Sequence, residues 1–388
     1  MSNQSLPPAP HDVRRLGFAR RIPLAAALDW MVDQMRVPDT EAVPVADAAH
    51  RVLAAPVHAG LDRPAADISS HDGYAVRAAD VEAADPYTPL QLAAGDPWRP
   101  GGACLIATGG IMPAGTDAVL PFEAVESLAG TLAATAPVAP GSGVRPQGSE
   151  ALAGRQILPA GRRLRPTDPV FLAALGVTSV TVTRRPVVAL LVIGPKPGGT
   201  DLLSPTLQTL ITNDGGNIRP IPTPDDLPAA LADAAATTDL LIVAGRTGSG
   251  ADDNAAQAVR AAGGTLAIHG VAVQPGGSAG LGRIGATHVL LLPGDPPACV
   301  AAYLLLAAPL VRRIGGLPNP PPVAPVKLHR KIASTIGVVE LVFVRLQDGA
   351  AVPLAADSLA PLHADGYVVV PEPGEGFAAG TLVPFHPL

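Results

Sequence analysis

Two loops of the sequence gather polar side chains that could take part in chemistry. Residues 69–76 (SSHDGYAV) place Ser, His and Asp directly before a strand-like Tyr-Ala-Val, so several polar groups share one loop. Residues 107–119 join Thr108 to a glycine-rich turn that leads on to Glu123. Each loop, taken alone, also fits an ordinary turn in which an Asp side chain accepts local backbone N–H groups and glycines adopt positive φ.

Two further loops could bind an anion. Residues 245–253 (GRTGSGADD) follow an apolar run and precede a helical pattern, so backbone N–H groups and a helix N-terminus would face the same ligand. Arg246 could add a bidentate contact. The glycine spacing matches neither a Walker loop nor GxGxxG. Residues 293–297 (PGDPP) form a second such loop, for which a plain turn is an equal alternative.

Composition excludes several other classes of function. The net charge is −6 and the chain has only three lysines, which argues against a nucleic-acid binder. The two cysteines, Cys104 and Cys299, are far apart, so neither a CxxC site nor a disulfide framework is expected and a reducing compartment is favoured. The histidines lack the spacing of a metal cage. The uncharged run 299–311 contains Pro309 and is too short for a membrane span, so a soluble cytoplasmic protein is expected.

The elements that must position these loops follow from the pattern of apolar residues. Three continuous apolar runs, each followed by Gly or Pro-Gly, predict strands buried on both faces: 187–193, 240–244 and 288–292. Helices are predicted around them at 207–212, 227–236 and 251–262. This alternation predicts a doubly wound α/β sheet, whose ligand crevice lies outside the carboxyl ends of the strands.

Four domains are predicted along the chain. A helical domain (20–56 and 145–180) begins with an amphipathic helix over 22–37, has a second helix from Thr167 to Gly176, and carries an inserted β-rich domain (57–144). The α/β domain (181–317) and a small C-terminal β-barrel or sandwich (318–388) follow, joined by a proline-rich linker at 318–325. Residues 1–20 are predicted to be poorly ordered, and Arg14-Arg15 and Arg20-Arg21 are interpreted as a solvated helix entrance.

Taken in order, these segments resemble the MoeA/gephyrin family, the molybdopterin molybdenumtransferases. Members carry Ser-Ala-Met-Asp-Gly-Tyr-Ala-Val, matched at 69–76 with His71 as a substitution, and Thr-Gly-Ala-x-x-Pro-x-Gly-x-Asp-Ala-Val, matched at 108–119 and followed by Glu123. Weaker similarities lie at 145–150, 159–164, 293–296 and 364–371. The resemblance spans nearly the whole chain and implies the four-domain MoeA-like fold.

The α/β domain departs from the family pattern at several elements. Thr-Gly-Asp-Glu-Leu reads here as 193–197 (IGPKP), and Asp-Thr-Asn is replaced by 204–206 (SPT). Lys-Pro-Gly-Lys-Pro becomes 274–278 (QPGGS), which loses both lysines. The Asn of Pro-Gly-Asn-Pro is Asp295, which adds a negative charge where an anion is expected. Arg246, Arg283 and Lys196 are the cations that could compensate.

The resemblance implies Mg²⁺-dependent insertion of molybdate into adenylylated molybdopterin with release of AMP. It also implies a homodimer whose crevice combines the α/β domain of one chain with the inserted domain of the other. Asp72 is expected as the main acid with Glu123 and Thr108, and Asp253 as the metal ligand. The expected ligand-binding residues are Gly245, Arg246, Gly248, Gly250, Asp253, Pro293, Gly294 and Asp295.

Two alternatives stay open because of the substituted elements. One is a non-catalytic paralogue that binds molybdopterin or the finished cofactor and delivers it to a molybdoenzyme or to another cofactor-biosynthesis protein. The other is a dimeric scaffold that has lost the ligand. The lost lysines and carboxylates favour these alternatives, whereas the intact motifs at Asp72 and Thr108 favour the enzyme.

Overall fold

The computed structural model describes residues 12–33, 39–128, 131–194, 201–222, 224–317, 323–357 and 359–388. The chain forms two compact units, one made of residues 42–182 and the other of residues 1–41 with 183–388. Lys196 and the first five residues of the predicted linker at 318–325 lie outside the described ranges.

The second unit is built on a six-stranded sheet in the order β14-β13-β15-β19-β18-β16. The strands are β13 (Val187–Val192), β14 (Asn217–Ile221), β15 (Leu240–Ala244), β16 (Thr265–His269), β18 (Gly280–Ile284) and β19 (Thr287–Leu292). Strands β14, β13, β15 and β19 are parallel, and β18 is antiparallel to β19 and to β16. The three strands predicted from apolar runs are therefore confirmed and lie side by side at the centre of the sheet.

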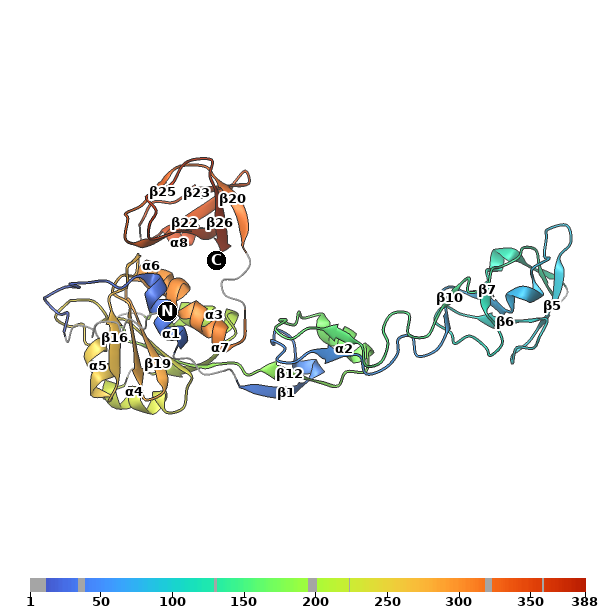
Figure 1. Ribbon diagram of the computed structural model, residues 1–388, viewed down its shortest axis with the longest axis horizontal. Coiled ribbons are helices and arrows are strands. Elements are labelled where there is room, and N and C mark those ends of the chain that lie inside the picture. Colours follow the sequence, from blue (N-terminus) through green and yellow to red (C-terminus); the bar gives the residue numbers. More distant parts are fainter. Residues whose placement is uncertain are drawn as a thin grey trace. The chain divides into compact units, whose positions relative to one another are not determined.

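Helices cover both faces of this sheet (Figure 1). Alternate residues of the central strands point to opposite faces, so Leu190 and Ile242 join one core cluster and Leu191 and Val243 the other. The first cluster includes buried side chains of α1 (Leu24–Asp33), α3 (Ser204–Asn213), α6 (Pro296–Ala302) and α7 (Ala308–Ile314). The second includes buried side chains of α4 (Leu227–Ala235) and α5 (Ala255–Ala261). This is the doubly wound arrangement that the sequence predicts.

Helix α1 packs in the α/β core, although the sequence analysis placed it in the first, helical domain. Its buried residues Ala27 and Met31 belong to the cluster that includes Val188 and Leu240. The helix begins at Leu24 because Ile22 instead makes a parallel bridge to Val271, with its N–H bonded to the Gly270 carbonyl at 3.0 Å. The end of the predicted helix, residues 34–37, lies outside the described ranges.

Residues 12–20 also pack against this unit, which corrects the prediction that they are poorly ordered. Val13 is buried, and the Arg15 N–H donates to the Ser249 carbonyl at 2.8 Å. The Phe18 ring meets the ring of His269 edge-on, with centroids 5.1 Å apart. The two arginine pairs therefore lie on a fixed segment.

One helix of the described residues, Pro296–Ile314, is long and apolar enough to cross a membrane by length and composition. The sequence analysis expected a shorter run because Pro309 lies inside it. Proline removes a helical hydrogen bond and crowds the carbonyl four residues earlier, and a π-helical stretch, Tyr303–Ala307, precedes Pro309 here. Tyr303, Leu306 and Val311 are fully buried in the core against the sheet, so the helix belongs to the interior of this unit.

The C-terminal residues form a small closed β-barrel. Its strands are β20 (Ala324–Leu328), β22 (Val339–Gln347), β23 (Ala350–Pro353), β24 (Gly366–Val370) and β26 (Leu382–Pro387), with a short helix α8 (Ala360–His363). The order β22-β23-β20-β26-β24 closes through pairing of β22 with β24. A further strand, β17 (Val273–Gln274), comes from the α/β part and pairs in parallel with β22. The prediction of a C-terminal barrel is confirmed.

The first unit carries a second six-stranded sheet, in the order β7-β4-β6-β5-β9-β8. Its strands are β4 (Gly73–Val76), β5 (Leu90–Ala94), β6 (Gly102–Ile106), β7 (Ala118–Leu120), β8 (Val125–Leu128) and β9 (Thr131–Ala134). Val76, Val81 and Leu120 are buried in its core. This is the β-rich segment predicted between residues 57 and 144.

The rest of the first unit contains more strand than the predicted helical domain would. Its strands are β1 (Thr40–Pro44), β2 (Val57–His58), β3 (Ile68–Ser69), β10 (Val144–Arg145), β11 (Gln156–Leu158) and β12 (Ser179–Thr183). Its α-helix, α2 (Asp168–Ala174), begins after Thr167, and Gly176 follows with φ of +74°. The helix is short because the alternating Val and Thr residues after Gly176 suit a strand, β12, whose Val180 and Val182 are buried.

Candidate functional site

The carboxyl ends of β13, β15 and β19 lie at one edge of the α/β sheet and border a cavity of about 350 Å³. The cavity is formed by the residues that leave these strands and by the first turns of two helices. Its lining residues are Val192, Ile193, Gly194, Asp201, Leu202, Leu203, Gly245, Arg246, Asp252, Gly294 and Pro296. Five of them belong to the loops singled out in the sequence: Gly245, Arg246, Asp252, Gly294 and Pro296.

Two glycines bring the loops close together at the strand ends. Gly245 has φ of +98°, and a Cβ on it would lie 2.5 Å from the Ile193 carbonyl oxygen. A Cβ on Gly294 would lie 3.2 Å from the Gly245 Cα. At Gly245 only glycine permits both the conformation and the approach, so this position sets how closely the loops after β13 and β15 meet.

The glycine loop after β15 is held by its own aspartate. The Gly250 N–H donates to Asp253 Oδ2 at 2.6 Å, and the Cβ that Gly248 lacks would lie 2.8 Å from the same oxygen. Asp253 therefore turns into the loop and orders it. Arg246 adopts a positive φ of +53°, and its side chain lines the cavity.

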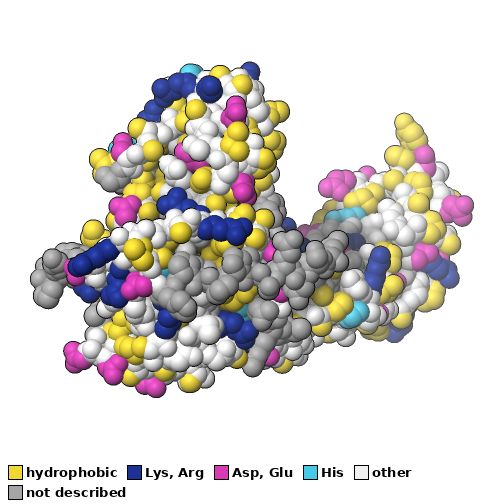
Figure 2. Space-filling view, turned by 60° about the vertical axis from the view of Figure 1, so that its left-hand side comes forward, with side chains coloured by type: hydrophobic (Ala, Val, Ile, Leu, Met, Phe, Trp, Pro, Cys, Tyr) yellow, Lys and Arg dark blue, Asp and Glu magenta, His cyan; other side chains and the backbone are white. Residues whose placement is uncertain are grey.

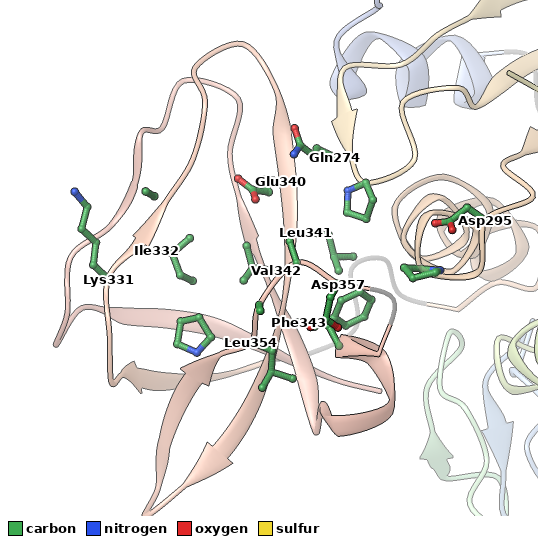
Figure 3. Close-up of a pocket in the computed structure, with 17 residues that line it drawn as sticks. Gln274, Asp295, Lys331, Ile332, Glu340, Leu341, Val342, Phe343, Leu354 and Asp357 are labelled. Atoms are coloured by element: carbon green, nitrogen blue, oxygen red, sulfur yellow. The ribbon is translucent and has the colours of Figure 1, made fainter. Parts of the chain in front are cut away.

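Asp295 does not face this cavity. It is the N-cap of α6, where its Oδ2 accepts from the Ala298 N–H at 3.3 Å, and a carboxylate is favoured at a helix N-terminus. Its side chain lines a second cavity of about 480 Å³, next to Gln274 and the barrel residues Glu340 and Phe343 (Figure 3). Asp295 is therefore not among the residues that line the cavity at the strand ends, because the cap turns its carboxylate toward the barrel.

Asp201 lines the cavity and was missed by the sequence analysis. Its Oδ1 accepts from the Leu203 and Ser204 N–H groups, both at 3.0 Å, and thereby caps α3. Burial raises the pKa of Asp201, but these hydrogen bonds outweigh it and hold the pKa below the usual value. The signal that could have found it is an Asp three residues before Ser-Pro, a common helix start.

Arg283 cannot serve the cavity, although the sequence analysis named it as a compensating cation. In the register of β18 with β19, Gly280 lies opposite Leu291 and Arg283 opposite His288. Arg283 is thus near the beginning of β19, at the edge of the sheet away from the cavity. The antiparallel direction of β18 was not foreseen from the sequence.

In the first unit, Asp72, Thr108 and Glu123 come to one edge of the inserted sheet. Gly73 lies opposite Ile106 in the pairing of β4 with β6, and Tyr74 lies opposite Leu120 in the pairing of β4 with β7. Asp72 precedes β4, while Thr108 and Glu123 follow the two partner strands. Strand register therefore gathers three residues that are far apart in sequence.

Thr108 fixes the carboxylate of Asp72. Its backbone N–H and its hydroxyl both donate to Asp72 Oδ1, at 2.7 and 3.0 Å. These two bonds hold the pKa of Asp72 below its usual value, and His71 lowers it further. Asp72 is exposed and is a carboxylate near neutral pH, so it suits a proton acceptor or an electrostatic contact better than an acid.

The weaker motif at 145–150 has a structural role. Glu150 accepts from Arg145 at 2.9 Å and from Arg63 at 3.1 Å, and so joins two segments of the first unit. All three side chains are largely exposed, so each ion pair adds little stability.

Comparison with known proteins identifies the family. Residues 22–176 match the model of the MoeA N-terminal region (domain I and II), and residues 190–313 match a probable molybdopterin binding domain. A molybdopterin molybdenumtransferase 2 of Mycobacterium tuberculosis is 30% identical over 319 residues, which cover 75% of this chain and 79% of that protein. The chain belongs to the MoeA family. A molybdopterin molybdenumtransferase of a Nostoc species is 31% identical over 306 residues, covering 72% and 70%.

Solved MoeA structures share the fold. A molybdopterin biosynthesis MoeA protein of Pyrococcus horikoshii superposes with a TM-score of 0.77 at 28% identity, and covers 95% of this chain and 99% of that one. A second structure of the P. horikoshii protein gives a TM-score of 0.78 at 26% identity. The MoeA-like fold expected from the two motifs is confirmed. The N-terminal family model begins at residue 22, so the segment with Arg14, Arg15, Arg20 and Arg21 lies outside its match.

Proposed function

We propose that this MoeA protein inserts molybdate into adenylylated molybdopterin and releases AMP. The observation that carries the proposal is the cavity at the carboxyl ends of β13, β15 and β19, where Gly245, Gly294 and Arg246 meet. Arg246 supplies positive charge, and the glycines allow a ligand to approach the backbone. The anionic phosphates of the substrate suit this combination.

We propose that Asp72 contacts the reacting centre as a carboxylate. Its fixed position on Thr108 and its lowered pKa support a role in accepting a proton or in orienting the oxyanion and its counter-ion. Glu123 lies at the same sheet edge and would assist. This revises the expectation that Asp72 is the main acid of the site.

The family resemblance implies Mg²⁺, and the donor set can be tested against it. Among the described residues, no group of three or more His, Cys, Asp or Glu gathers as a metal site. Mg²⁺ commonly takes one or two carboxylates together with substrate phosphates and waters, and Asp201 and Asp252 both line the cavity. These two would hold the ion in place of Asp253, which is not among the residues that line the cavity and whose Oδ2 accepts from the Gly250 amide. Bound Mg²⁺ would neutralise phosphate charge.

We also propose that the protein works in the cytoplasm as a homodimer. The ligand cavity belongs to the second unit and the Asp72 group to the first, so each chain carries both halves of a site. In the dimer, the cavity of one chain would be completed by Asp72 of the other. Mixed Asp72→Ala and Arg246→Ala chains would then regain activity when combined, because one of the two sites has both wild-type halves.

The experiment that tests the function is a single-turnover assay. Purified protein is given adenylylated molybdopterin, molybdate and Mg²⁺, and AMP release and molybdenum incorporation are measured together. Equal amounts of AMP and inserted molybdenum, lost in Asp72→Ala, support the insertase. Binding of the pterin with no AMP release would overturn it.

A carrier is the second candidate, because Gln274 stands where the family has a lysine. In the structure Gln274 belongs to β17, pairs opposite Glu340 of β22, and faces the cavity next to the barrel. A carrier would bind molybdopterin without turnover, unchanged in Asp72→Ala, and would pass it to a molybdoenzyme or another biosynthesis protein. Absence of any binding would leave the dimeric scaffold.

A further inference from the structure

The N-terminal segment 12–22 lies along the loops at the carboxyl edge of the α/β sheet. Arg15 bonds the glycine loop at Ser249, and Gln257 of α5 donates to Asp12 Oδ1 at 3.1 Å. Farther along, the bridge from Ile22 to Val271 ties the segment to the chain just before residues 274–278. The segment is therefore held by both loops that border the edge.

Within this segment, the Arg21 guanidinium lies over Gly277. A Cβ built on Gly277 would lie 3.0 Å from Arg21 Cζ and 3.2 Å from Arg21 Nε. Gly277 is the position at which the family element has its second lysine. The arginine thus occupies the space in which a side chain of residue 277 would begin.

The loop that carries Gly277 lies at the same edge as the cavity. Gly280 begins β18 opposite Leu291, near the end of β19, so the residues just before Gly280 lie beside the carboxyl end of β19, and a Cβ on Gly276 would lie 3.2 Å from the Ala298 carbonyl oxygen of α6. Ser278 and Thr247 of the glycine loop are linked by a hydrogen bond between their hydroxyls, 3.2 Å apart. Arg21 is therefore placed beside the loops that hold the ligand.

The charge of Arg21 is available. Within the part of the chain that the structure describes, its side chain forms no ion pair, and its Cζ lies 6.0 Å from the centroid of the Phe18 ring, at the outer limit of a cation–π contact. Arg14, by contrast, is bound to Asp12, with Nη2 to Oδ2 at 2.8 Å. Basic side chains on the face shown in Figure 2 are interspersed with acidic and hydrophobic ones.

We propose that Arg21 supplies a cationic contact to the anionic substrate. It would take the place of the lysine that the family element has at the position of Gly277. The cation comes from the segment before the family-matched region and reaches the ligand over a glycine that leaves room for it. The proposal rests on the proposed function, because it concerns the same ligand. It identifies a substrate-binding residue that neither the sequence motifs nor the family model includes.

The test compares the binding of adenylylated molybdopterin by calorimetry in wild type and three variants. Arg21→Ala is expected to raise the dissociation constant about 10- to 100-fold, as for the loss of one charge-assisted contact. Arg313→Ala removes the same charge from the last turn of α7, and is expected to stay within about twofold of wild type, since screening weakens distant charges. Arg21→Ala/Gly277→Lys moves the cation back into the loop and is expected to recover most of the affinity.

The outcomes separate this inference from the proposed function. Wild type that fails to bind overturns both. Equal binding by wild type and Arg21→Ala overturns the inference alone, as does a double variant no better than Arg21→Ala. If thermal denaturation shows that Arg21→Ala is destabilised, Arg21→Gln, which keeps the stem over Gly277 and removes only the charge, takes its place in the comparison.

Discussion

Thr108 donates two hydrogen bonds to one carboxylate oxygen of Asp72, one from its backbone N–H and one from its hydroxyl. Such an arrangement orders the loop before β4 and keeps the carboxylate ionised. The two motifs that mark the family in the sequence are therefore one structural pair, and their roles can be separated by substitution.

Asp72→Asn should reduce turnover at least about 100-fold with little change in thermal stability. The amide oxygen of Asn can still accept from Thr108, so the loop keeps its shape while the charge is lost. AMP release and the melting temperature are measured on the same preparation. Glu82→Gln, an exposed acid of the same unit, is the matched control, and equal activity of the two variants would contradict a role for Asp72.

Gly245→Ala should destabilise the protein by about 2–5 kcal/mol, since both strain and overlap oppose a side chain there. Its φ is +98° and the new Cβ would lie 2.5 Å from the Ile193 oxygen. Gly263→Ala separates the two effects, because Gly263 has φ of +77° with nothing within 4 Å of the added carbon. We expect that control to cost about 1–2 kcal/mol in denaturant unfolding; a cost as large as that of Gly245→Ala would refute the overlap.

Asp295→Asn should leave both the stability and the ligand affinity nearly unchanged. Asn and Asp are comparable N-caps, so the free energy of unfolding is expected to shift by less than about 0.5 kcal/mol. Affinity stays the same because the side chain lines the cavity next to the barrel. A clear gain in affinity on calorimetry would mean that the carboxylate does repel the ligand.

Acid should destabilise the second unit through His288. Burial, aided by the positive charge of Arg283, lowers the pKa of His288 to about 4 from 6.5. The folded form holds His288 neutral, so its contribution to stability is complete above pH 6.5 and is lost as the pH falls toward 4. The slope of unfolding free energy with pH should approach about 1.4 kcal/mol per unit in that window.

The matching measurement follows urea unfolding of wild type, His288→Gln and His58→Gln between pH 4 and 7. The His288→Gln slope should be smaller by nearly one proton, while His58, which is exposed, serves as control. Identical slopes in all three proteins would show that His288 is not the group responsible.

The sequence predicted the three central parallel strands of the α/β sheet better than the strands beside them. Strands β13, β15 and β19 are buried on both faces, and such strands must be continuous apolar runs. Strand β18 (GLGRI) contains two glycines and was not recognised, since its close packing against β16 and β19 requires them: a Cβ on Gly282 would lie 2.2 Å from the Thr265 oxygen.

Site residues could be predicted where the local backbone requires a particular residue type. They could not be predicted where their role depends on packing against segments far away in the sequence. Gly245 and Gly294 stand out because strand-end loops need them. For Asp295 the sequence leaves the direction of the side chain open, because a carboxylate beside proline can cap a helix or face a ligand. Asp201 carries only a helix-start signal and Arg21 carries no motif, so only the folded chain brings them to the carboxyl edge.

Strand β17 links the terminal barrel to the loop 274–278. Val273 and Gln274 pair with Val339 and Glu340 of β22, and the Val339 N–H also donates to the Ala272 carbonyl at 2.9 Å. Three residues later the same loop presents Gly277 to Arg21. A chain ending before residue 323 would lose this pairing and also the barrel side chains of Val339, Leu341 and Phe343, which pack in the same core cluster as the central strands. We therefore expect such a truncation to lower the stability of the α/β part as well as the ligand affinity. The terminal barrel thus supports the loop 274–278 through β17, and we expect substitutions in the barrel to change the geometry of that loop.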